Sequence, residues 1–206
     1  IKADKLSSLI FYGPPGTGKT SLARLIAHTT ASGFSKMNAV TAGVAEIKRV
    51  VSDTQNPILN PSGRTVLFID EIHRFNKLQQ DALLPQVEDG TLILIGATTE
   101  NPFFEVNKAL ISRSTVLQLK PLNETDIVCI LKMALSDKER GLGNELIEVA
   151  DETLLQIANL SNGDARIALN AIELASVTTP PDATGTVRID SKVLEDCMQK
   201  RSIAFD

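Results

Sequence analysis

The chain has 206 residues, of which 43% are hydrophobic and 22% are charged, and its 21 Lys and Arg against 25 Asp and Glu leave a net charge of −4. This composition excludes disordered, collagen-like and coiled-coil classes, and the length suits one large domain or a core with a small satellite. No apolar run approaches the ~18 residues of a membrane span and the first residues lack a signal peptide's apolar stretch, so we expect a cytoplasmic or nuclear protein with no membrane partner.

The first part of the chain alternates apolar, β-branched runs with stretches of helix length. The predicted strands are Leu9–Tyr12, Phe34–Val40, Thr65–Asp70, Thr91–Thr98 and Ser114–Leu119. The predicted helices are Thr20–Ala31, Val44–Asn56 and Asn76–Val87. This alternation is typical of an α/β fold with a parallel, doubly wound sheet whose faces are covered by helices.

Strand patterns stop after Lys120, and Pro121 marks a predicted domain boundary. The predicted helices beyond it are Glu124–Ser136, Asp151–Leu160, Asp164–Val177 and Asp190–Lys200, with Asn123, Asp164 and Asp190 suited to begin helices and Thr178–Gly185 as a loop. We therefore expect an α/β domain over residues 1–120 and a small all-helical domain over residues 121–206.

The two cysteines, Cys129 and Cys197, lie in apolar-periodic stretches of this second part. We interpret both as small buried hydrophobic residues in a reducing compartment. They are too few for a four-ligand zinc module built from cysteines.

A glycine-rich segment follows the first predicted strand and opens a helix, the context in which this pattern binds phosphate. Its backbone N–H groups would curl around the phosphates, and the start of the helix adds its positive end. Lys19 would reach the β- and γ-phosphates of ATP, and the Thr20 hydroxyl would ligate Mg²⁺. The predicted nucleotide-binding residues are Gly13, Pro14, Pro15, Gly16, Thr17, Gly18, Lys19, Thr20 and Ser21.

Two carboxylates, Asp70 and Glu71, follow the buried strand Val66–Ile69. The carboxyl ends of the strands are where ligands bind in open α/β sheets. Asp70 can hold Mg²⁺, and Glu71 can polarise the water that attacks the γ-phosphate. An isolated acidic pair after a strand is often a helix cap, but the upstream phosphate loop favours the catalytic interpretation.

The run Asp70-Glu71-Ile72-His73 also matches a helicase box. Such motors close ATP between two similar α/β domains. The chain has no strand patterns left after Leu119 to build a second one, which argues against this class.

Three segments carry a resemblance to a known family: Gly13–Thr20, Asp70–Lys77 and Gly96–Pro102. Together they resemble the AAA+ ATPases, and more narrowly the RarA/MgsA replication-associated recombination ATPases, relatives of Werner helicase-interacting protein. The resemblance runs through essentially the whole chain. It implies the sheet order 5-1-4-3-2 and a helical lid as the second domain.

The same resemblance implies a DNA-dependent ATPase that uses ATP and Mg²⁺ at stalled replication forks and single-strand/double-strand junctions. The implied partners are DNA, single-stranded-DNA-binding protein and further copies of the chain in a tetramer, in the bacterial nucleoid or a nucleus. Because the chain does not begin with Met, we expect a core fragment. An adenine-enclosing N-terminal segment and a C-terminal oligomerisation domain would then lie outside it.

Four further site residues are implied residue by residue. Thr99 resembles the first sensor, a polar group that places the attacking water or the γ-phosphate. Arg113, in a Ser-Arg-Ser run, resembles the arginine of the clamp-loader Ser-Arg-Cys element, which reaches the neighbouring subunit's γ-phosphate. Arg166 resembles the second sensor in the lid. Asn38 resembles a switch residue that lies beside Glu71 and holds it away from water.

Several alternatives remain open. A clamp-loader subunit or a Holliday-junction branch-migration motor would share the phosphate loop, although the Glu100-Asn101-Pro102 continuation disfavours both. A non-hydrolysing ATP-binding assembly module would have no need for Glu71. His28 is interpreted as helix surface, and no aromatic stacking platform for nucleic acid is evident. Scattered basic residues suit either solvent or DNA phosphates: Lys48, Arg49, Arg74, Lys77 and Lys108.

Overall fold

The computed structural model describes residues 7–30 and 32–194, which fall into two compact units divided between Lys120 and Pro121. Unit 1 contains, in chain order, β1 (Ser8–Tyr12), α1 (Lys19–Thr29), β2 (Gly33–Asn38), α2 (Val44–Gln55), β3 (Thr65–Asp70), η1 (Ile72–Arg74), α3 (Lys77–Asp81), α4 (Leu84–Glu88), β4 (Leu92–Thr98), α5 (Pro102–Glu105), α6 (Lys108–Ser112) and β5 (Ser114–Gln118). Unit 2 contains α7 (Glu124–Ser136), β6 (Ile147–Val149), α8 (Asp151–Leu160), α9 (Ala165–Thr178) and β7 (Val187–Ile189).

The five strands of unit 1 form one parallel sheet in the order β2-β3-β4-β1-β5. This order confirms the predicted 5-1-4-3-2, read from the other side. Since all five strands are parallel, their carboxyl ends meet at one edge of the sheet. The phosphate loop leaves that edge from β1, and the Asp70-Glu71 pair leaves it from β3.

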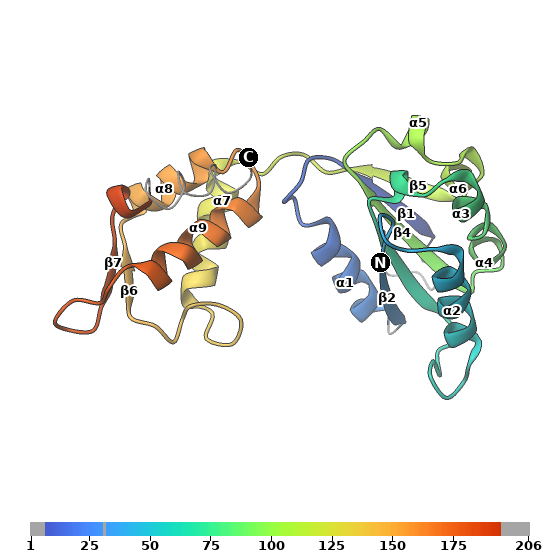
Figure 1. The fold of residues 1–206 in the computed structure, drawn as a ribbon, viewed down its shortest axis with the longest axis horizontal. Helices are drawn as coiled ribbons and strands as arrows, with labels where there is room; N and C mark the ends of the chain where they lie inside the picture. Colours follow the sequence, from blue (N-terminus) through green and yellow to red (C-terminus); the bar gives the residue numbers. More distant parts are fainter. Residues whose placement is uncertain (1–6, 31, 195–206) are drawn as a thin grey trace. The chain divides into compact units, whose positions relative to one another are not determined.

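Alternate side chains of the central strands enter two separate cores. Val66 and Phe68 pack with the α1 face, while Leu67 and Ile69 pack with residues of α2 and the later helices. Figure 1 shows α1 on one side of the sheet and α2, α3 and α4 on the other. Each fully buried Phe, Leu or Ile contributes about 1.5–3 kcal/mol, so the sheet is a rigid base for its carboxyl edge.

The single helix predicted over Asn76–Val87 is wrong, because α3 ends at Asp81 and α4 starts at Leu84. Pro85 lacks an N–H group, and its ring would clash with the carbonyl of residue 81 in a continuous helix. Further short elements went unpredicted: the one-turn η1 and the small helices α5 and α6.

Unit 2 is not all-helical, which corrects the sequence-based prediction. β6 and β7 pair in parallel, with Glu148 opposite Arg188 and an ion pair of 2.5 Å between their side chains. Asp182 accepts hydrogen bonds from Thr184, Thr186 and Arg188, which lower the pKa of its carboxyl group and shape the turn before β7. Strands of three residues are too short to show a period-two pattern.

The predicted helix caps of unit 2 are present. Asn123 begins α7 with a capping box that it shares with Asp126, and Asp164 begins α9. Asp190 accepts a hydrogen bond from the Val193 backbone at the start of the helix predicted to run to Lys200. The rest of that predicted helix and Cys197 lie outside the described residues. Among the described residues, no helix has both the length and the apolar character to cross a membrane.

Cys129 is exposed, which corrects its interpretation as a buried residue. The buried positions of α7 are Ile127 and Leu131. Residue 129 lies two positions from each of them, and residues two apart do not share a helix face.

Replacing Asn123 with alanine is expected to lower the free energy of unfolding of unit 2 by about 1 kcal/mol, because the Asp126 backbone N–H at the start of α7 loses its acceptor, the Asn123 side-chain oxygen. Urea unfolding followed by far-UV circular dichroism would measure this as a lower midpoint at an unchanged m value. The exposed Thr125→Ala, within the same helix turn, is the control. An unchanged midpoint for Asn123→Ala would contradict the assignment of the cap.

Candidate functional site

The loop between β1 and α1 is shaped by glycines at positive φ. Gly13, Gly16 and Gly18 have φ values of 146°, 70° and 85°, which favour glycine. A Cβ atom on Gly13 would lie 2.1 Å from the carbonyl oxygen of Leu119, and the Gly13 N–H donates to the Thr98 carbonyl at 3.2 Å. The start of the loop therefore packs closely against the ends of the neighbouring strands, which holds its backbone in place as a cradle for a phosphate chain.

Lys19, the first residue of α1, folds back over this loop. Its Nζ donates to the carbonyl oxygens of Gly13 and Pro14, each at 2.8 Å, and the Thr17 hydroxyl donates to Pro14 at 3.0 Å. Thr20 and Ser21 follow in the first turn of the helix. The loop thus places a cation and two hydroxyl groups at a helix N-terminus, which together favour a bound anion.

Asp70 ends β3, and Glu71 follows it in the left-handed backbone region, with φ 54° and ψ 45°. This conformation costs a non-glycine residue roughly 1–2 kcal/mol. Strain of this kind persists only where the surroundings impose it, and it concentrates at functional sites. The turn directs the Glu71 side chain away from the course of the strand.

Glu71 contacts a histidine that sequence reasoning did not single out. Nδ1 of His73 lies 3.4 Å from the Glu71 carboxylate and 2.8 Å from the hydroxyl of Thr98. The register pairs Ile69 with Gly96, and its continuation brings Thr98 level with Glu71. The signal available beforehand was the place of His73, two residues after Glu71 in the same motif.

The structure separates Thr98 from Thr99. Thr98 ends β4 and is fully buried, whereas Thr99, the predicted first sensor, lies one residue beyond the strand and is exposed. Thr99 is thus available to a bound group at the carboxyl edge, and Thr98 is engaged by the protein itself.

Asn38 ends β2 directly opposite Asp70 in the strand register. Its side-chain oxygen accepts a hydrogen bond from the Val40 backbone at 2.9 Å. The register thus places Asn38 beside Asp70, one residue before Glu71, and its side-chain oxygen is engaged by the turn after β2.

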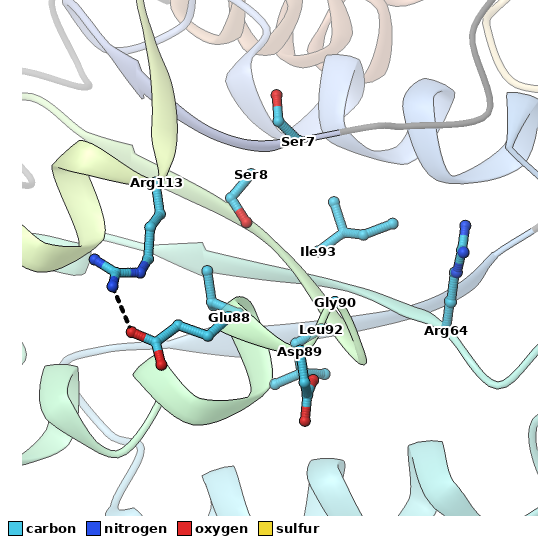
Figure 2. Close-up of a pocket in the computed structure, with 10 residues that line it drawn as sticks. Ser7, Ser8, Arg64, Glu88, Asp89, Gly90, Leu92, Ile93 and Arg113 are labelled. Atoms are coloured by element: carbon cyan, nitrogen blue, oxygen red, sulfur yellow. Dashed lines mark ion pairs between the residues drawn. The ribbon is translucent and has the colours of Figure 1, made fainter.

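Arg113 lies at the opposite, amino-terminal edge of the sheet, just before β5 begins. Five residues of β5, about 16 Å at the usual strand rise, separate that edge from the carboxyl edge. Its guanidinium pairs with Glu88 at 2.6 Å and donates to the Ala109 carbonyl at 3.0 Å. Figure 2 shows this pair beside a cavity whose other lining residues include Ser8 and Arg64.

Arg166 lies in the first turn of α9 in unit 2. Its side chain is 67% exposed and pairs with Asp164 at 3.4 Å. Arg166 is therefore presented on the surface of unit 2, with a partner on its own helix cap.

The surface of unit 1 carries the scattered basic residues and several phenylalanines, of which two on α5 are the most exposed. Phe103 and Phe104 on α5 are 57% and 83% exposed, although no aromatic platform was evident from the sequence. His28 is exposed, as predicted. The five basic residues singled out from the sequence are all exposed: Lys48, Arg49, Arg74, Lys77 and Lys108.

Two protein-family descriptions match this chain. Residues 9–122 match the ATPase family associated with various cellular activities (AAA), and residues 143–206 match the AAA C-terminal domain.

Similar curated proteins include the replication-associated recombination protein A of Escherichia coli K12, which is 47% identical; the match covers all of this chain and 46% of that protein. The replication-associated recombination protein A of Bacillus subtilis is 42% identical, and the match covers all of this chain and 48% of that protein. The ATPase WRNIP1 of Dictyostelium discoideum is 40% identical over 93% of this chain and 22% of that protein. The chain thus spans about half the length of the recombination proteins. These similarities confirm the resemblance predicted from Asp70–Lys77 and Gly96–Pro102.

Among solved structures, the Thermotoga maritima RuvB Holliday junction branch migration motor is similar, with a TM-score of 0.71 and 28% sequence identity. The match covers 95% of this chain and 62% of that one. The α/β fold predicted for residues 1–120 is therefore shared with a protein whose fold is known.

Proposed function

Because this chain belongs to the AAA family of ATPases, we propose that it binds ATP at the carboxyl edge of the unit 1 sheet and hydrolyses it to ADP and phosphate. The observation that carries the proposal is the convergence of the phosphate loop, Asp70 and Glu71 at that edge. These groups are the parts that phosphoryl transfer requires: a cradle, a cation, a metal ligand and a water-polarising base.

The phosphate loop fits the triphosphate. Three glycines at positive φ allow the loop backbone to curl so that its N–H groups can surround phosphates. A side chain at Gly13 would have no room. Lys19 now donates to two loop carbonyls. These contacts are exchanged for phosphate oxygens when ATP binds, and charge-assisted bonds of that kind are about twice as strong as neutral ones.

The residues at this edge also fit Mg²⁺. No group of three or more His, Cys, Asp or Glu side chains within residues 7–30 and 32–194 makes a complete protein cage. Mg²⁺ usually keeps several waters and takes one or two protein oxygens together with substrate phosphates. Thr20 and Asp70 supply two such oxygens, and a bound Mg²⁺ would neutralise charge on the transferring phosphoryl group.

Glu71 then acts as the base that orients and polarises the attacking water. Thr99, exposed just past β4, assists in placing that water or the γ-phosphate. By the family resemblance, Arg166 of unit 2 takes the role of the second sensor, and Arg113 acts on the phosphates of a neighbouring copy. The position of Arg113 at the far edge of its own sheet supports action on another subunit.

We further propose that ATP turnover drives the binding or remodelling of DNA junctions in replication-associated recombination. Support comes from the 47% identity to a replication-associated recombination protein, compared with 28% to a branch migration motor. The exposed Phe103 and Phe104 offer faces on which unpaired bases can stack, and the exposed Lys108 begins α6, which contacts their helix. Single-stranded-DNA-binding protein as partner, a tetramer and a place in the cytoplasm, nucleoid or nucleus belong to the same proposal.

The test measures phosphate release by the protein at its natural length, with and without forked DNA, at fixed ionic strength because salt weakens DNA binding. We expect slow basal turnover that forked DNA accelerates. ATP binding without turnover under both conditions would identify a non-hydrolysing assembly module. Turnover that is indifferent to DNA would remove the DNA part of the proposal alone.

Asn38 gives a separate prediction. If its amide leaves Val40 and restrains Glu71 before DNA binds, Asn38→Ala is expected to raise basal ATP turnover and to shrink the stimulation by forked DNA. Asn38→Asp, which keeps an acceptor for the Val40 N–H group, controls for damage to the turn. An unchanged ratio of stimulated to basal rates in Asn38→Ala would end the switch assignment.

A further inference from the structure

We propose that His73 is a positioning residue that links the Glu71 carboxylate to Thr98 of β4, and this proposal rests on the ATP hydrolysis proposed above. The three residues come from different parts of unit 1: the turn after β3, η1 and the end of β4. Nothing in the phosphate-loop chemistry requires a histidine at this place, and its role is inferred from its contacts.

Thr98 is the fixed end of this linkage. Its side chain is fully buried, and its hydroxyl oxygen accepts the Glu100 backbone N–H at 3.0 Å. The same oxygen lies 2.8 Å from Nδ1 of His73. A buried hydroxyl held by two neighbours has little freedom to move, so it fixes the edge of the imidazole ring.

Glu71 is the adjustable end. Its side chain is 35% exposed, compared with 9% for His73, and its carboxylate lies 3.4 Å from Nδ1. This separation exceeds the 2.7–3.2 Å range of a normal N–H···O bond. The contact therefore biases the position of the carboxylate without clamping it, so that Glu71 remains able to reach a water molecule.

The chemistry of the three groups sets the direction of the hydrogen bonds. An ionised carboxylate only accepts, so attraction between Glu71 and His73 requires a proton on Nδ1. With that proton on Nδ1, the oxygens of the Thr98 hydroxyl at 2.8 Å and of the Glu71 carboxylate at 3.4 Å can both accept from it. The left-handed backbone at Glu71 fixes where the side chain starts but not its rotamer, and His73 restricts the rotamer.

The linkage also connects Glu71 to the strand that precedes Thr99. A shift of the end of β4, on which Thr99 follows Thr98, is transmitted through His73 to the carboxylate. His73 thus coordinates the base with the residue proposed to sense the γ-phosphate.

The test compares His73→Leu with His73→Asn in the protein at its natural length. The two replacements have similar shapes, but only Asn keeps a polar atom near the place of Nδ1. We expect His73→Leu to lower kcat by about 10- to 100-fold, the usual effect of misplacing a reactive group by about 1 Å. We expect His73→Asn to retain most of the wild-type kcat. The KM for ATP and the thermal midpoint should change little in both variants.

Thr98→Val and Thr98→Ser form the second pair, and only Ser keeps the hydroxyl. We expect Thr98→Val to lower kcat, as His73→Leu does. The double variant His73→Leu/Thr98→Val should lower kcat no further than the more severe of the two single variants, because the pair acts as one unit. Additive losses, or equal kcat for His73→Leu and the wild type, would overturn the positioning role. Absence of turnover in the wild type would instead overturn the proposed function.

Discussion

Lys19→Ala is expected to weaken ATP binding, whereas Glu71→Gln is expected to preserve ATP binding and to abolish most turnover. Lys19 supplies charge-assisted bonds to phosphate oxygens, each contributing about 1.5–3 kcal/mol, so its loss should lower ATP affinity by about 10- to 100-fold. In the proposed site, Glu71 would contact the attacking water and not the nucleotide. Removal of its charge should lower kcat by about 10²- to 10⁴-fold.

Calorimetric titration with ATP and a phosphate-release assay separate the two effects. The exposed Lys36→Ala and Glu139→Gln remove the same charges elsewhere on the chain and serve as controls. Equal loss of ATP affinity in Lys19→Ala and Glu71→Gln would contradict the division of labour. Full turnover by Glu71→Gln would assign the base to another residue.

Arg113→Ala is expected to lower turnover by about 10³- to 10⁵-fold in the oligomer with little effect on ATP affinity, because an arginine supplied by a neighbour stabilises charge on the transferring phosphoryl group. Arg113 cannot act on the site of its own subunit, since the length of β5 lies between them. It must also leave Glu88, its partner at 2.6 Å. Arg64→Ala removes another exposed arginine lining the same cavity and is the matched control.

Mixing Arg113→Ala protein with Glu71→Gln protein tests whether the site is shared. In a mixed oligomer, some interfaces pair an intact Glu71 with an intact Arg113, so part of the activity should return. If mixed oligomers form and turnover stays at the level of the separate variants, the shared site is wrong. A monomeric wild-type chain that turns over as fast as the oligomer would contradict it equally.

Local patterns determined much of this molecule. The glycines of residues 13–18 and the carboxylates Asp70 and Glu71 could be assigned from sequence, because a phosphate cradle needs specific residue types at fixed spacing within one strand–loop–helix unit. The strands of unit 1 were also predictable to within a few residues, since buried strands are continuous apolar runs. The sheet order came from family resemblance, and the observed order agrees with it.

Contacts between distant segments were decided only by the tertiary structure. His73 meets Thr98, a residue 25 positions later in the chain, and β6 pairs with β7 although each has three residues. Glu88 forms an ion pair with Arg113 at the amino-terminal edge of the sheet. The contacts of a single polar side chain leave no periodic signal in the sequence. The partner of such a side chain depends on strand register and on turns such as the left-handed one at Glu71. Local propensity and spacing therefore predict which groups carry chemistry, while packing selects which of them touch.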